Sequence, residues 1–259
     1  MISHSEAAHL NPSCDFILMT KKPLKEDYQL KERFKLESEV FDKQALLHLS
    51  KLITKGIIKT VDYPVSTGKE ANVFRATTPS GTYVAIKIYK NETAPFFRKM
   101  DYLEGDPRFE RVKHNDREIV KAFARKEFKN LEICERAGVN APKPYYIVDR
   151  IIVMSFLGEG DLPYPTMNVI GPLHGEKDLD SILEDIRKMY RAGLVHADIS
   201  EYNVLMGDVP YIIDFGQGVV RDHPHSMKFL ERDVSIILKY FQKFGFRRDL
   251  QKTVDWIKK

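Results

Sequence analysis

The sequence is poor in cysteine and tryptophan, with two and one in 259 residues, and it contains no long apolar run. Cys14 and Cys134 are too few for a disulfide framework, so we expect a protein of a reducing compartment, the cytoplasm. The longest near-continuous apolar run, Ile151 to Leu157, is far below the ~18 residues that a membrane span needs. The polar N-terminus lacks the pattern of a secretory signal, and we expect no membrane association.

The chain also lacks a strong excess of charge of either sign. Lysine and arginine number 41 against 37 aspartate and glutamate residues, a formal net charge of +4. This excess is compatible with an anionic partner but does not indicate one. Hydrophobic residues at 43% and charged residues at 30% are typical of a soluble globular protein, and the length suits one large domain or two small ones.

Local patterns change along the chain. Residues 57–90 are rich in Val, Ile, Tyr and Thr, which favour strands, and Pro79 and Gly81 predict a tight turn between two of them. Residues 91–114 combine Pro, Gly and many charges and predict a long loop. Apolar residues at helical spacing predict a helix over 116–137.

These patterns predict an α+β protein in which a strand-rich half precedes a helix-rich half. Residues 1–55 are expected to form an N-terminal helical extension, residues 56–154 a strand-rich lobe and residues 155–259 a helical lobe. A Gly- and Pro-rich link at 157–165 separates the two halves. We therefore expect two lobes with a cleft between them.

Asp198, Asn203 and Asp214 stand in an order that is typical of phosphoryl transfer. Asn203 follows Asp198 by five residues, and Asp214 begins an Asp-Phe-Gly segment after a short apolar run. The Asp198 carboxylate would orient an attacking hydroxyl and accept its proton. The amide oxygen of Asn203 and the carboxylate of Asp214 are hard ligands that suit Mg²⁺. Each residue alone is also a common turn former, but the three together predict a catalytic site.

Lys87 lies on a strand predicted over Thr82–Tyr89, in which alternation places Ala85 and Lys87 on one face. A small residue leaves room for an adenine ring, and the lysine would reach the α and β phosphates of a nucleotide. By itself this is an ordinary strand with a lysine. Its position 111 residues before Asp198 makes it the candidate phosphate anchor.

Such a lysine needs an acidic partner on a helix. Glu118, Glu127 and Glu132 all lie on the predicted helix 116–137. Glu127 is nearest the middle of that helix, and we predict that it pairs with Lys87.

The segment Ser66-Thr67-Gly68-Lys69-Glu70 is not a Walker A motif. That motif needs Gly five residues before its Gly-Lys pair and Ser or Thr after it, where this sequence has Tyr63 and Glu70. The segment also lies between two predicted strands, whereas a P-loop joins a strand to a helix. We interpret it as a short loop that covers phosphates, with main-chain N–H groups and the Ser66 hydroxyl as donors.

His196 lies two residues before Asp198. We favour a structural role in bracing the catalytic segment, while its ordinary titration near neutral pH leaves an acid or base role open. The other histidines show no metal-ligand spacing, so no zinc site is expected.

Several of these motifs, in this order, resemble the RIO family of atypical protein kinases. The segments that carry the likeness are Ser66–Phe74, Val195–Leu205 and Tyr211–Gln217. Glu104–Phe109 and Lys126–Leu131 are similar to the Rio-one subfamily. The likeness covers roughly residues 25–250, and the size resembles that of archaeal members.

The resemblance implies a trimmed two-lobe protein-kinase fold with an N-terminal helical extension. It implies a serine kinase or ATPase that uses ATP with Mg²⁺ or Mn²⁺ in maturation of the small ribosomal subunit, whose precursor of protein and rRNA would be the partner. Asp198 would be the base, Asn203 and Asp214 would hold the metal, and Asp214 could itself accept a phosphoryl group. The expected ATP-binding residues are Ser66, Gly68, Lys69, Glu70, Val73, Ala85, Lys87, Glu127, Met154, Ser155 and Leu157, of which the last three match the hinge beside adenine.

The sequence departs from ordinary protein kinases in ways that bear on the phosphate acceptor. Ala197 replaces an arginine and Ser200 replaces a lysine of their catalytic loop, and 45 residues follow Asp214. We therefore expect that an extended peptide is not recognised in the ordinary way. The acceptor and the oligomeric state stay open.

Two other classes of function also stay open. A small-molecule phosphotransferase of the aminoglycoside or choline kinase type shares the His-x-Asp-x-x-x-x-Asn pattern, although the loop at 66–70 disfavours it. A ribosome-binding module with a nucleotide switch is the third class. Its candidate RNA contacts, Lys21, Lys22, Lys25 and Lys31, are interleaved with acidic residues, which favours a solvated helix face instead.

Overall fold

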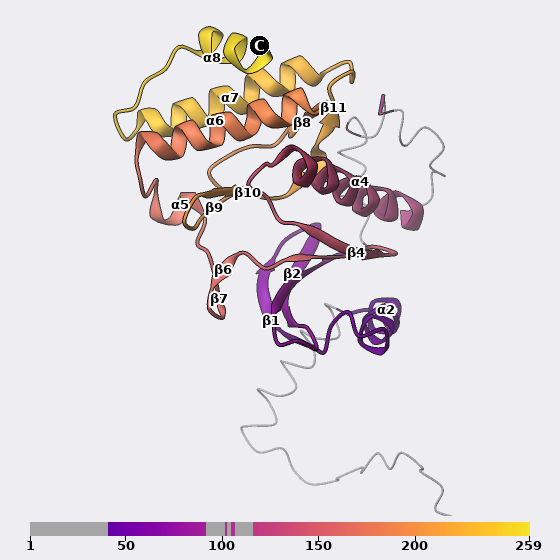
Figure 1. Cartoon of the computed structure of the whole chain (residues 1–259). Coiled ribbons are helices and arrows are strands. Elements are labelled where there is room, and N and C mark those ends of the chain that lie inside the picture. Colours follow the sequence, from indigo (N-terminus) through magenta and orange to yellow (C-terminus); the bar gives the residue numbers. More distant parts are fainter. Residues whose placement is uncertain (1–40, 92–101, 103–104, 107–115) are drawn as a thin grey trace, which may run out of the picture. The chain divides into compact units, whose positions relative to one another are not determined.

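A five-stranded antiparallel sheet forms the first half of the described chain. The strand order is β1-β2-β3-β5-β4, with β1 at Thr60–Thr67, β2 at Ala71–Thr77, β3 at Tyr83–Tyr89, β4 at Pro144–Val148 and β5 at Ile151–Ser155 (Figure 1). The predicted turn joins β2 to β3, where the Gly81 N–H donates to the Thr78 carbonyl over 3.0 Å and Gly81 has φ +84°. Pro64 is tolerated because β1 is an edge strand.

The computed structural model describes residues 41–91, 102, 105–106 and 116–259. The N-terminal extension up to residue 40, with Cys14 and the basic stretch, and most of the predicted 91–114 loop lie outside these residues. The proposed division at residues 55 and 154 therefore stays a prediction. Within the described part of the chain, no helix is long and apolar enough to cross a membrane.

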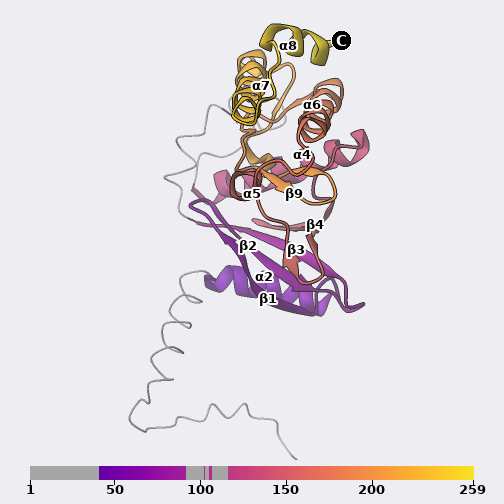
Figure 2. The same ribbon diagram turned by 90° about the vertical axis from the view of Figure 1, so that its left-hand side faces the viewer.

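Two helices cover opposite faces of the sheet (Figures 1 and 2). Helix α2, Lys43–Thr54, packs on the face that carries Phe74, Ile86 and Val153. Helix α4, Asp116–Ala137, belongs to a separate hydrophobic cluster, which includes Ala85 and Ile152 from the other face of the sheet. Because side chains alternate along the strands, one face of the sheet packs against α2 and the opposite face, with Ala85, packs against α4.

The second half is mainly helical. Figure 1 shows α6 and α7 side by side, with α8 lying over them. Three pairs of short strands and two short helical segments connect these helices. The elements are β6 (Gly158–Glu159), β7 (Leu162–Pro163), α5 (Met167–Ile170), α6 (Glu176–Arg191), β8 (Leu194–Val195), β9 (Val204–Met206), β10 (Pro210–Ile212), η2 (Phe215–Gln217), β11 (Val219–Val220), α7 (Ser226–Gln242) and α8 (Leu250–Lys258).

The prediction of an α+β protein with a strand-rich half before a helical half is confirmed. The predicted helix 116–137 coincides with α4, whose end Gly138 marks with φ +68°. The patterns missed α5, α8 and the β6–β7 pair. These elements are short, and two to nine residues are too few to show a clear period.

Docking of α2 on the sheet can be tested by removing apolar volume from each side of the helix. Leu52 is 1% exposed in the hydrophobic cluster between α2 and the sheet, and Leu47 on the same helix is 55% exposed. We expect Leu52→Ala to lower the free energy of unfolding by about 2–5 kcal/mol in denaturant titrations, because it leaves a cavity. Leu47→Ala should change it by less than about 0.5 kcal/mol. Equal losses in the two variants would contradict this packing.

Candidate active site

A cavity of about 430 Å³ lies between the sheet and the first part of the helical half. All of the sequence-predicted ATP-binding residues line it, together with both predicted metal ligands. They are Ser66, Gly68, Lys69, Glu70, Val73, Ala85, Lys87, Glu127, Met154, Ser155, Leu157, Asn203 and Asp214. Their roles stay predictions, but the fold brings residues from positions 66 to 214 to one place.

The sequence did not single out the aromatic and apolar residues that complete the lining. Phe156, Tyr164, Tyr202, Leu205 and Ile213 belong to this group. They lie in or after the predicted hinge, or beside the catalytic motifs. Their proximity in sequence to these segments could have identified them as lining residues. An apolar cavity with a few charged groups at one end suits a nucleotide, because the base and the phosphates need opposite surroundings.

Lys87, on β3, carries a buried positive charge in this cavity. The residue is 7% exposed, and its Nζ lies 2.7 Å from Glu127 Oε1 and 3.0 Å from Asp214 Oδ1. Burial alone would lower the pKa of Lys87, but the charges of Asp214 and Glu127 outweigh burial and hold the pKa above its ordinary value. The lysine is therefore a fixed cation. The structure brings Glu127 to it, rather than Glu118 or Glu132.

Tyr89 is a further member of this group that the sequence analysis missed. Its hydroxyl donates to Glu127 Oε2, and its ring is 2% exposed. The strand alternation that placed Ala85 and Lys87 on one face also places Tyr89 there, so the signal was present. The contact holds the second oxygen of Glu127 while Lys87 holds the first.

The segment with Asp198 depends on a buried carboxylate from α7. The Ala197 N–H donates to Asp233 Oδ2 over 2.8 Å, and Ala197 has φ +64°, a left-handed conformation that is costly for a residue with a Cβ. Burial raises the pKa of Asp233 to about 7, against the lowering effect of Arg232. Sequence analysis missed Asp233, although its spacing from Leu230 and Ile237 places it on the apolar face of that helix.

Asn203 and Asp214 fit a magnesium ion by the chemistry of their donors. The Asn203 amide nitrogen donates to the Asp198 main-chain oxygen over 2.8 Å, which leaves its amide oxygen as the atom that could bind a cation. The Asp214 side chain is 48% exposed and contributes a carboxylate. Mg²⁺ usually takes one or two protein oxygens and completes its shell with water and phosphates.

Asp214 itself has an unusual backbone, with φ +66° and ψ +69° just before η2. Only a few side chains adopt this left-handed region readily, and aspartate is among the tolerated ones. This turn follows β10 and directs the Asp214 carboxylate toward Lys87. The strain is concentrated where the predicted metal ligand stands.

His196 has the surroundings of a structural residue. It is 1% exposed, its Nε2 lies 3.1 Å from the Ile213 carbonyl, and its ring packs edge-on against Phe215 with the centroids 4.7 Å apart. Burial lowers the pKa of His196 to about 4, so the ring is neutral at physiological pH and its Nε2–H is the donor. This geometry braces the strand that carries Asp214.

The loop between β1 and β2 is closed by its own main chain. The Gly68 N–H donates to the Ala71 carbonyl over 2.9 Å, and a Cβ at Gly68 would lie 3.0 Å from the same oxygen. In this conformation the Gly68 N–H is engaged within the loop, and Gly68 shapes the turn. The predicted contacts of main-chain N–H groups and of the Ser66 hydroxyl with a phosphate stay predictions.

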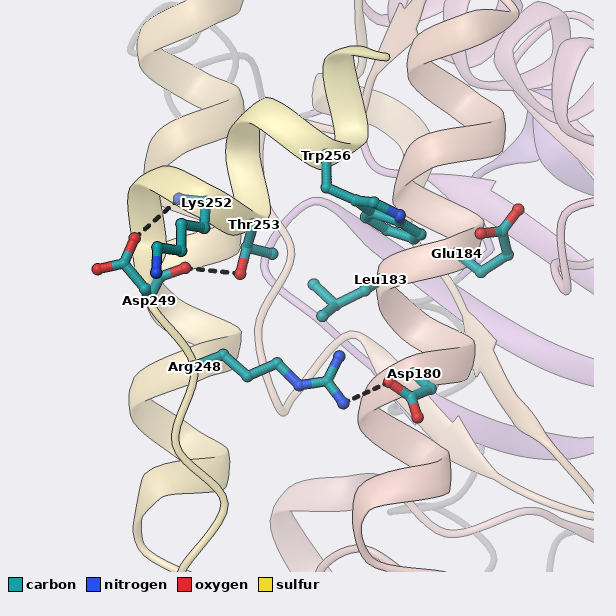
Figure 3. Close-up of a pocket in the computed structure, with 8 residues that line it drawn as sticks. All are labelled: Asp180, Leu183, Glu184, Arg248, Asp249, Lys252, Thr253 and Trp256. Carbon is teal, nitrogen blue, oxygen red and sulfur yellow. Dashed lines mark hydrogen bonds and ion pairs between the residues drawn. The ribbon is translucent and has the colours of Figure 1, made fainter.

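A larger cavity, of about 530 Å³, lies between α6 and α8 (Figure 3). Its lining mixes both signs of charge with one aromatic side chain, and Arg248 reaches across to Asp180 over 2.6 Å. The residues are Asp180, Leu183, Glu184, Arg248, Asp249, Lys252, Thr253 and Trp256. None of the predicted phosphoryl-transfer residues belongs to it, so the smaller cavity is the candidate site.

The burial of His196 predicts a pH dependence of stability. Its pKa falls from 6.5 to about 4 on folding, so the stability it confers is complete above about 6.5 and is lost as pH falls through about 4. His196→Gln keeps a donor but does not titrate, and its free energy of unfolding should fall less than that of the wild type between these pH values. Calorimetry at several pH values measures this. The wild-type slope in His196→Gln would refute the assignment.

Comparison with known proteins agrees with this geometry. A family model described as the RIO domain matches residues 72–253. The RIO-type serine/threonine-protein kinase Rio1 of Haloferax volcanii is 39% identical over 219 residues, which are 84% of this chain and 76% of the relative. Rio1 of Thermoplasma acidophilum is 40% identical over 187 residues, 72% of this chain and 99% of the relative. Human RIO1 is 38% identical over 212 residues, but these cover 37% of its length.

The fold has a counterpart among solved structures. The Rio2 kinase of Chaetomium thermophilum, in a complex with ADP, Mg²⁺ and phosphoaspartate, superimposes with a TM-score of 0.63 at 22% identity, over 82% of this chain and 65% of that one. This likeness confirms the kinase-like fold. Together, the family match and the archaeal relatives show that the chain belongs to the RIO family of serine/threonine-protein kinases, in its Rio1 group.

Proposed function

We propose that this chain is a Mg–ATP-dependent serine kinase or ATPase that acts on the maturing small ribosomal subunit. The observation that carries the catalytic part is the position of Lys87, whose ammonium contacts both Glu127 and Asp214 in the cavity. A buried cation beside a predicted metal ligand supports the binding of a nucleotide phosphate chain.

Different residues of the cavity would bind different parts of ATP. The apolar walls at Ala85, Met154 and Leu157 accommodate the base, and Lys87 meets the phosphates at the charged end. Asn203 and Asp214 would hold Mg²⁺, or Mn²⁺ in its place. When bound, this ion neutralises charge that accumulates on the phosphate oxygens.

Asp198 acts on the acceptor. It takes the proton of a serine hydroxyl or of water while the acceptor oxygen forms a bond to the γ-phosphorus and the bond to the ADP oxygen breaks. A serine acceptor gives kinase activity, and water gives ATPase activity. The Chaetomium Rio2 complex contains phosphoaspartate. We propose that Asp214 can likewise accept the phosphoryl group here, with its carboxylate as the nucleophile.

The ribosomal partner rests on the family. The family resemblance of the sequence implies a role in maturation of the small subunit, and its precursor, protein and rRNA together, is the partner that we propose. Sedimentation of the wild-type chain with purified small-subunit precursors tests this. We expect co-sedimentation that depends on a bound nucleotide. Free migration under all nucleotide conditions would refute the partner without affecting the proposed chemistry.

Substitution of the two aspartates tests the chemistry. Asp198→Asn removes the proton acceptor and should lower ATP turnover and self-phosphorylation by roughly 10²- to 10⁴-fold. Asp214→Asn removes the carboxylate that meets the metal and should abolish phosphate incorporation at that position. Release of phosphate and mass spectrometry after incubation with Mg–ATP measure both, with EDTA as the metal-free reference.

Asp255→Asn on α8 is the matched control, because it makes the same chemical change at an exposed aspartate far along the chain from the motifs. It should keep wild-type turnover. Full activity of Asp214→Asn would refute the site. Binding of ATP by the wild type with no transfer and no release would favour the nucleotide-switched module.

A further inference from the structure

Gln217, the last residue of η2, makes a short side-chain hydrogen bond to the Asp198 carboxylate. Its Nε2 donates to Asp198 Oδ2 over 2.7 Å. The Asn203 amide approaches the same oxygen at 3.4 Å and makes its short bond to the Asp198 main chain instead. The geometry points to Gln217 as a positioning residue for Asp198 in phosphoryl transfer, an inference that rests on the proposed function.

The main chain around Gln217 is fixed by two buried side chains from α4. Lys126 Nζ donates to the carbonyls of Gly216 and Gln217 over 3.4 and 3.2 Å, and Lys126 is 0% exposed. One helical turn later, Asn130 Nδ2 donates to the carbonyls of Phe215 and Gly218 over 2.9 Å each. A segment held at four carbonyls cannot shift without breaking several buried bonds, which are costly to leave unmade.

Glycine at position 218 makes this clamp possible. A Cβ there would lie 2.8 Å from the Asn130 amide nitrogen, closer than real Cβ contacts come. The Gly218 N–H also closes η2 by donating to the Phe215 carbonyl over 3.1 Å. The backbone that presents the Gln217 side chain is therefore fixed from two sides.

The same helix also holds the other end of the site. Glu127 follows Lys126 directly and binds Lys87 at 2.7 Å. Helix α4 thus contacts the phosphate anchor through Glu127, and it contacts the segment of Gln217 through Lys126 and Asn130. One helix therefore links the two ends of the site, and a transfer between two bound groups requires that both be held in place.

Gln217 supplies a neutral donor to the carboxylate that it contacts. Position 200, where ordinary protein kinases have lysine, is serine. The Gln217 amide N–H, bound to Oδ2, restrains the rotamer of Asp198. A proton acceptor must be held in place beside the hydroxyl that it deprotonates.

Two substitutions test this role. Gln217→Met keeps the length of the side chain and removes the donor, and Gln217→Glu places a second carboxylate beside Asp198. We expect kcat for ATP turnover to fall roughly 10- to 100-fold in both, with KM for ATP within about twofold of the wild type.

Gln251→Ala is the control, since Gln251 on α8 makes an exposed amide-to-carboxylate bond of 3.1 Å to Asp255. It should leave kcat and KM unchanged. Wild-type kcat in Gln217→Met would overturn the inference, provided that the wild type turns over ATP. An inactive wild type would instead refute the proposed function. Loss of kcat together with Mg–ADP binding by calorimetry, or with thermal stability, would assign Gln217 a structural role and also overturn it.

Discussion

The burial of one positive charge, that of Lys87, is the constraint on which the rest of the site depends. An ammonium that has lost its water needs negative partners at short distance, and it has two of them. Glu127 is buried with it, and without this carboxylate the half-exposed Asp214 would be the remaining partner of the two. Because β3 carries the lysine and α4 carries the glutamate, the ion pair fixes the helix against the sheet.

The second partner of Lys87 connects this ion pair to the predicted metal site. Asp214 is half-exposed and approaches Lys87 from the helical half of the chain. The same charge that fixes α4 therefore also holds the carboxylate that would meet Mg²⁺. A phosphate chain that enters the cavity meets a cation already in place, and little reorganisation is needed when charge develops there.

The neighbouring catalytic segment is held in a conformation that it would not adopt alone. Ala197 and Asp214 both have left-handed backbones, which cost about 1–3 kcal/mol each. Asp233 binds the N–H at Ala197, and His196 binds the carbonyl just before Asp214. Both of these polar groups are almost fully buried. Buried polar contacts on either side of the segment thus offset the strain at the site.

The sequence by itself determined the features that depend on patterns over a few residues. Alternation in β3 placed Ala85 and Lys87 on one face, and helical spacing predicted α4. The interval between Asp198 and Asn203 predicted phosphoryl transfer. Only the tertiary structure decided that Glu127 is the partner of Lys87, that Asp233 supports Ala197 and that Gln217 contacts Asp198. These pairs join residues that are 19 to 40 positions apart. Their meeting depends on how α4, α7 and η2 pack, and no local period encodes that packing.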